Sequence, residues 1–102
     1  MRPAPEFDEL IHAPTRLSIV ALLAASQWAE FTFVRDSLGM SDSALSKQVS
    51  TLEDAGYVTV RKTGAGRSRR THIRLSPRGR RAFSGHAAAL QQLIADATAP
   101  AR

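Results

Sequence analysis

The spacing of apolar residues changes along the chain in a way that predicts its elements. Over residues 6–56 apolar side chains recur at the spacing of amphipathic helices. Over residues 57–61 and 71–75 they alternate with polar ones, which is typical of strands. From residue 76 the helical spacing returns and continues to about residue 98. We therefore predict an α+β chain that is mainly α, with a two-stranded hairpin followed by one long helix.

The N-terminal part is expected to hold two helices. Two prolines oppose helix formation within residues 1–5, which are therefore expected to be a loose leader. A short helix over residues 6–12 and a longer one over residues 15–25 should follow. The longer helix is apolar over much of its circumference, and this places it at the centre of the core. Residues 6–30 are thus assigned to N-terminal helices and their connection.

Residues 31–56 carry the spacing of two helices joined by a tight turn. Residues 31–38 are followed at once by Gly39, and Ser41 is a good N-cap for the next helix. Gly56 marks the end of that helix, because glycine adopts the left-handed conformation at no steric cost. This is the helix-turn-helix pattern, although a plain helical hairpin has the same spacing. The buried face of the second helix is predicted to consist of Leu45, Val49 and Leu52.

The other face of this second helix is small and polar, which suits a helix that lies close against a polar surface. Lysine donates to guanine O6 and N7, and serine contacts either base type. Ser41 and Thr51 are expected to contact phosphates, whereas Gln48 either contacts the DNA backbone or packs. The candidates for contacts with base edges are Ser43, Ser46, Lys47 and Ser50.

Charge is distributed unevenly around a net value of +5. Residues 1–60 hold four basic and eight acidic side chains, whereas residues 61–81 hold nine basic side chains and no acid. A solvated basic face is the ordinary explanation of clustered charge, but the absence of any carboxylate over this length is less often accidental. The asymmetry therefore indicates that one side of the molecule binds a polyanion.

The hairpin over residues 57–75 carries most of this positive charge. Its tip contains two glycines and is expected to be flexible, with arginines that reach phosphates or a narrow minor groove. Further basic residues on the outward strand face should extend the same track. The tip residues are Arg67, Arg69 and Arg70, and the strand residues are Arg61, Lys62 and Arg74.

Composition and motifs argue against several classes of function. The 102 residues include no cysteine, which removes disulfides and thiolate metal sites. No signal-peptide core or membrane-length apolar run occurs, so a soluble, cytoplasmic protein is expected. No catalytic or phosphate-loop motif is present, so neither an enzyme nor a cofactor is expected. His12 and His86 could meet near a dimer interface as zinc ligands, but ordinary packed or surface histidines are favoured, and no metal site is predicted.

Several blocks of the sequence together resemble winged-helix regulators of the MarR/ArsR type. They are L-S-K-x-x-x-x-L-E-x-x-G-Y-V over residues 45–58, the Gly/Arg hairpin, L-S-P-x-G-R over residues 75–80, and D-E-L-I-H-A-P-T-R-L over residues 8–17. The chain looks most like the short, stand-alone winged-helix DNA-binding family related to MarR, over roughly residues 8–94. It lacks the cysteine-bearing metal box of many ArsR proteins and is shorter than a typical MarR protein.

The resemblance implies a homodimeric transcription factor, expected to be a repressor, that binds double-stranded DNA with one recognition helix in each half-site.

 The dimer-forming side chains are expected on the first and last helices, because they carry more apolar surface than one small domain covers. A protein-interaction module that uses the same fold as a scaffold, and a nonspecific nucleic-acid binder, are the alternatives. No small-molecule effector is assigned. The expected dimer residues are Phe7, Leu10, Ile11, Phe83, Ala87, Leu90, Leu93 and Ile94.

Overall fold

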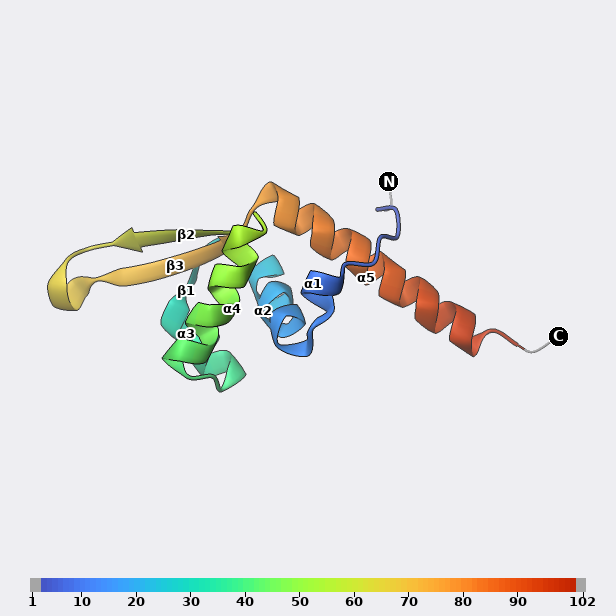
Figure 1. The fold of residues 1–102 in the computed structure, drawn as a ribbon, viewed down its shortest axis with the longest axis horizontal. Coiled ribbons are helices and arrows are strands. Elements are labelled where there is room, and N and C mark those ends of the chain that lie inside the picture. The colour runs from blue at the N-terminus through green and yellow to red at the C-terminus, as the bar shows by residue number, and fades with distance from the viewer. Residues whose placement is uncertain (1–2, 101–102) are drawn as a thin grey trace.

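The computed structural model describes residues 3–100, and its elements follow the predicted order. A body of short helices lies in the middle, a β-hairpin projects from one side, and the last helix projects from the other (Figure 1). The molecule is therefore elongated, with extents of 64 × 27 × 20 Å. The elements are α1 (Glu9–His12), α2 (Pro14–Ala24), β1 (Ala29–Glu30), α3 (Phe31–Leu38), α4 (Asp42–Asp54), β2 (Val58–Thr63), a 3-10 turn (Gly66–Ser68), β3 (Arg70–Leu75) and α5 (Pro77–Thr98).

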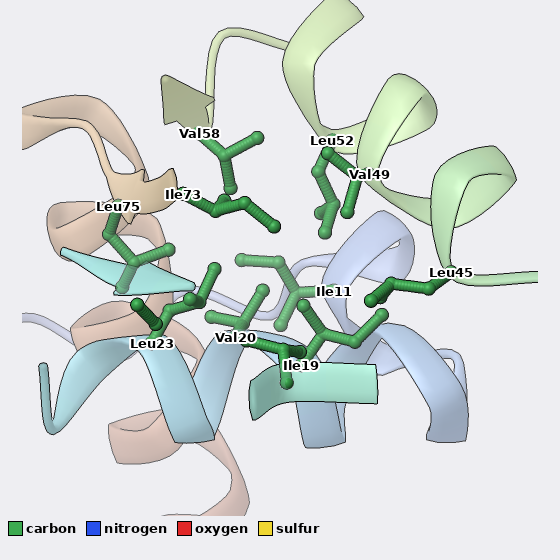
Figure 2. Packing of buried hydrophobic residues seen from close by; sticks show 12 residues of the cluster. Ile11, Ile19, Val20, Leu23, Leu45, Val49, Leu52, Val58, Ile73 and Leu75 are labelled. Atoms are coloured by element: carbon green, nitrogen blue, oxygen red, sulfur yellow. The ribbon is translucent and has the colours of Figure 1, made fainter. Parts of the chain in front are cut away.

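The core lies where α4, α2 and the base of the hairpin meet. Side chains of α4 point towards α2 from one side, and strand side chains close the core from another (Figure 2). The predicted buried face of α4 is confirmed, because its three apolar residues are at most 6% exposed. The labelled core residues are Ile11, Ile19, Val20, Leu23, Leu45, Val49, Leu52, Val58, Ile73 and Leu75.

Local signals in the sequence fix both ends of the helix-turn-helix as predicted. The Ser41 hydroxyl accepts a hydrogen bond from the Ala44 amide at 3.2 Å and so caps α4. Gly39 and Gly56 have φ angles of 64° and 78°, the left-handed region in which only glycine is unstrained. The short turn between α3 and α4 and the stop after α4 therefore follow from single residues.

The start of α5 is packed tightly against the end of α4. Ser76 caps α5 by accepting from the Gly79 amide at 3.0 Å, and its own amide donates to the Tyr57 carbonyl at 3.0 Å. A Cβ atom at Gly79 would lie 2.0 Å from that carbonyl oxygen, closer than any real contact. The glycine of the L-S-P-x-G-R block is thus required where the helix crosses the backbone of residue 57.

The sheet has one strand more than the sequence predicts. Ala29 and Glu30 form β1, which pairs antiparallel with Ile73 and His72 of β3, so the strand order is β1-β3-β2. Two residues are too few to show an alternating pattern, so this strand had no sequence signal. The two predicted strands are confirmed, with Val58 opposite Leu75 and Thr63 opposite Arg70.

The N-terminal segment also differs from expectation. The first helix begins at Glu9 rather than residue 6, because the Asp8 carboxylate accepts from the Ile11 amide at 3.0 Å and caps the helix there. Residues 3–5 are exposed and form no helix or strand; they lie along α5, and just after them the Glu6 amide donates to the Gly85 carbonyl at 2.9 Å. The first two residues of the predicted leader lie outside the described part of the chain.

Among residues 3–100, no helix combines the length and apolarity that crossing a membrane requires.

Candidate nucleic-acid interface

The polar face of α4 is open to solvent and carries little bulk. The four side chains predicted to contact bases are all exposed, and Lys47 is the long one among three serines. The Ser41 hydroxyl at the start of α4 lies 3.4 Å from the Ser43 hydroxyl, while the Thr51 hydroxyl donates to the Lys47 carbonyl at 3.1 Å. A helix with so short a set of side chains on one face can approach another surface closely.

Gln48 is held from within the protein by Arg16 of α2. The Arg16 guanidinium donates from Nη1 to Gln48 Oε1 at 3.0 Å and from Nε to the Leu10 carbonyl at 2.6 Å. Packing, one of the two expectations for Gln48, therefore accounts for its side-chain oxygen. Arg16 was not singled out from the sequence, although a cation on the largely apolar second helix needs polar partners when it is half-buried. It fixes α4 relative to α1 and α2.

A second arginine joins α3 to the first turn of α4. Arg35 donates to Asp36 and to Asp42, each at 2.8 Å. These hydrogen bonds raise the pKa of Arg35 above its ordinary value, and the partnership with Arg35 lowers the pKa of Asp36. Because Asp42 lies beside the exposed face of α4, Arg35 offsets a negative charge where an anion would otherwise be repelled.

The basic residues of the hairpin lie on two different faces of the sheet. Arg61 pairs with His72 and Arg74 with Thr59, which places both arginines on the face opposite Val58 and Ile73. Lys62 pairs with Thr71 on the other face. The expectation that Lys62 shares a face with Arg61 is therefore wrong, because consecutive side chains of a strand point to opposite sides.

Arg61 and Arg74 both contact the ring of Trp28, immediately before β1. Their guanidinium carbons lie 4.2 and 4.7 Å from the ring centroid, within the range of a cation–π interaction. Arg70, on the same face, forms an ion pair with Glu30 at 3.3 Å. The base of the hairpin is thus held by groups from the segment that precedes α3.

The tip of the hairpin remains available for a partner. Arg67 and Arg69 are exposed, and within residues 3–100 neither takes part in an ion pair. Two glycines with φ angles of 76° and 56° shape the tip around them.

Two other arginines of the acid-free stretch serve the fold. Arg80 donates to the Ala24 and Ser26 carbonyls at 3.3 and 2.9 Å, beyond the end of α2, and Arg78 lies over the Tyr57 ring.

The apolar residues assigned to a dimer interface divide into buried, exposed and half-buried groups. Ile11 is completely buried in the core, so the expectation that it forms part of an interface is wrong. Leu93 and Ile94 are each 62% exposed, and Phe7 is 50% exposed, as an uncovered surface requires. The half-buried members of the set are Leu10, Phe83, Ala87 and Leu90.

The two histidines considered as zinc ligands meet within one chain rather than across an interface. His86 is completely buried, and its Nε2 lies 3.2 Å from His12 Nδ1. His86 Nδ1 accepts from the Asp8 amide at 3.0 Å, so its proton lies on Nε2 and faces His12. Asp8 also accepts from the Tyr57 hydroxyl at 2.5 Å. A metal at Nε2 would displace this proton, and within residues 3–100 no cluster of three potential ligands occurs.

This histidine pair gives the fold a dependence on pH. Burial, and then the nearby His12, lower the pKa of His86 below 6.5, while Asp8 acts in the opposite direction. Below pH 6.5 the unfolded chain therefore binds more protons than the folded one, and the free energy of unfolding should fall as the pH is lowered. Urea unfolding at pH 7.5 and 5.5 should show a loss of at most about 1.4 kcal/mol from this group. His86→Gln should reduce that loss, and an undiminished loss would assign it to other groups.

Comparisons with known proteins agree with this geometry. A family model described as a winged helix DNA-binding domain matches residues 15–94. An uncharacterized protein of Methanocaldococcus jannaschii is 27% identical over 85 residues, covering 83% of this chain and 92% of that protein. A transcriptional regulator homologue from Pyrococcus horikoshii OT3 superposes with a TM-score of 0.84 at 23% identity, covering 90% of this chain and 91% of the other.

Two larger regulators share the fold as well. The PcaV transcriptional regulator of Streptomyces coelicolor, solved with its natural ligand, has a TM-score of 0.73 at 21% identity, covering 94% of this chain and 67% of PcaV. The M. tuberculosis regulator MOSR, solved in complex with DNA, has a TM-score of 0.67 at 21% identity, covering 85% of this chain and 62% of MOSR. The fold described here is thus one found in transcriptional regulators.

Proposed function

The chain belongs to the family of winged helix DNA-binding domains, and from this premise we propose that it is a homodimeric, sequence-specific transcriptional repressor. The observation that carries the proposal is the exposed face of α4. The helix is capped at its start, and this face consists of small polar side chains and a single lysine. In the proposed complex α4 enters the major groove as the recognition helix. The wing, formed by β2, β3 and the tip between them, lies against the adjacent backbone or minor groove. The proposed place of action is the cytoplasm.

The residues of α4 divide between reading and positioning. Lys47 donates to guanine O6 and N7, and the neighbouring serines contact base edges more weakly. Ser41 and Thr51 are assigned to phosphates, which fix the register of the helix without reading sequence. Gln48, whose side-chain oxygen is taken by Arg16, keeps its amide group for a backbone phosphate. Groove shape should add to the modest specificity of these contacts.

The dimer is proposed from the exposed apolar side chains of α5 and the N-terminal segment. A twofold axis would bring the same patch on two chains together, so that each covers the other. Two recognition helices about 34 Å apart would then face successive major grooves on one side of the DNA. The operator should accordingly be an imperfect palindrome. Selection of bound duplexes from a random pool tests this, because it reveals both sequence preference and half-site symmetry.

Two single substitutions separate reading from backbone contact. Lys47→Ala should lose about 1–3 kcal/mol on the selected site and little on random DNA, because it removes a base contact. Arg69→Ala should weaken binding to all sequences alike and flatten the dependence of log affinity on log salt by about one unit. Binding curves on the selected and a scrambled duplex, at several salt concentrations, measure both effects.

Each variant is the control for the other in this experiment. Equal losses by Lys47→Ala on the two duplexes would remove Lys47 from the reading set. An unchanged salt slope for Arg69→Ala would remove Arg69 from the phosphate track. A wild-type protein that selects no sequence yet binds every duplex would be a nonspecific nucleic-acid binder.

A further inference from the structure

We propose that Trp28 sets the direction in which the wing meets DNA, which makes it a positioning residue for binding; this inference rests on the proposed function. Trp28 lies outside the wing, in the connection between α2 and β1. Its ring nevertheless contacts one arginine from each wing strand, Arg61 of β2 and Arg74 of β3. A single side chain from the body of the protein therefore touches both strands of the wing.

The inner face of the wing's base packs into the core through Val58, Ile73 and Leu75, whereas Trp28 contacts the arginines of its outer face. Strand β1 is only two residues long and pairs with Ile73 and His72 alone. Between the Lys62–Thr71 pair and the tip, the hairpin is a two-stranded ribbon. Isolated ribbons of this kind are marginally stable. The contacts at its base therefore set the direction of its tip, with the core on the inner face and with β1, Trp28 and the Glu30–Arg70 ion pair on the strand edge and outer face.

The charges on the outer face explain why an aromatic ring is needed there. Arg61, Arg70 and Arg74 occupy the same face of the sheet, and Glu30 is paired with only one of them. Like charges on neighbouring strands repel one another and would spread or twist the ribbon. The π face of Trp28 attracts both of the remaining guanidinium groups and so keeps them together.

A small change at the base becomes a large displacement at the tip. The tip is about four residues beyond Arg61, or roughly 13 Å at 3.3 Å per strand residue. A tilt of about 10° would then move the tip arginines by roughly 2 Å, enough to lose hydrogen bonds to phosphates. Arg61 and Arg74 accordingly act on DNA through the direction of the wing, whereas Arg67 and Arg69 make the contacts.

The experiment compares Trp28→Ala with the conservative Trp28→Phe, which retains an aromatic face. Trp28→Ala should weaken binding about five- to tenfold on selected and scrambled duplexes alike, since each cation–π contact is worth roughly two- to fivefold. It should also flatten the salt slope by about one to two units, because the tip no longer reaches its phosphates. Trp28→Phe should stay within about twofold of wild type and keep the wild-type slope.

A second pair of variants tests whether the effect passes through the tip. In a protein that already carries Arg67→Ala and Arg69→Ala, adding Trp28→Ala should cause no further flattening of the salt slope. Arg61→Ala with Arg74→Ala, which leaves the ring in place and changes only exposed residues, should reproduce the Trp28→Ala result and serves if that variant folds poorly. Thermal melting, together with fluorescence of the protein's one tryptophan in the variants that keep it, reports on the fold.

The outcomes are distinct for the inference and for the function on which it rests. A wild-type slope for Trp28→Ala, or flattening that simply adds to that of the tip variant, would overturn the positioning role while DNA binding stands. Tighter binding by Trp28→Ala would also overturn it, because the ring would then be withholding the arginines from DNA. A wild-type protein that binds no duplex would overturn the function and the inference together.

Discussion

Replacing Leu52 with alanine should lower the free energy of unfolding by about 2–5 kcal/mol. Leu52 is completely buried on the core face of α4, where it meets α2 and the base of the sheet (Figure 2). The substitution removes its apolar contacts and leaves a cavity, since a packed core relaxes only in part. Small domains have only about 5–15 kcal/mol of stability in total, so the loss should be plain in urea or thermal unfolding.

Ser50→Ala is the matched control for this substitution. Ser50 lies on the exposed face of the same helix, so its loss should change the free energy of unfolding by less than about 0.5 kcal/mol. A melting temperature for Leu52→Ala within a degree or two of wild type would contradict the packing of α4 described above.

Replacing Ile94 with glutamate should split the proposed dimer. Ile94 is 62% exposed in the single chain, so the change leaves the winged helix fold intact while placing a charge in the proposed interface. Binding to a palindromic operator should fall by at least about 100-fold, because two linked half-sites bind far more tightly than one. Sedimentation reports the oligomeric state, and titration of the operator reports the affinity.

Gln92→Glu adds the same charge elsewhere on α5 and is the control. At about 100° per residue, position 92 lies on the far side of the helix from Leu90, so this variant should remain dimeric. The dimer proposal fails if the wild-type protein sediments as a monomer at micromolar concentration and still binds its operator with full affinity.

The helices could be predicted from the sequence because their signals are local. Ser41 and Gly56 mark the limits of α4, and Ser76 with Pro77 marks the start of α5; each acts within about one turn of its position. Strand β1 could not be predicted, because it exists only through pairing with Ile73, 44 positions further along the chain. The late start of the first helix has a local cause in the Asp8 cap, a signal that the sequence analysis did not use.

The same division holds for the candidate interface: positions set by helical periodicity could be predicted, and contacts between distant segments could not. The exposed face of α4 follows from helical periodicity, so the positions of Ser43, Lys47 and Ser50 are as expected. The partners of Arg16 and Arg80 lie 32 and more than 50 residues away, and no pattern in the sequence joins them. The contact between Trp28 and the wing arginines also joins distant parts of the chain, so the sequence pattern could not predict it.

The close crossing of Gly79 over the Tyr57 carbonyl has a mechanical consequence for the proposed dimer. It joins the start of α5 to the turn that follows α4, so a change in the direction of α5 is expected to pass to α4. A 22-residue helix is about 33 Å long at 1.5 Å per residue, and rotating it by about 5° displaces one end relative to the other by roughly 3 Å. In the proposed dimer, the angle at which two α5 helices cross would thus set the distance between the recognition helices. A change of a few degrees would alter that distance by about one base-pair step.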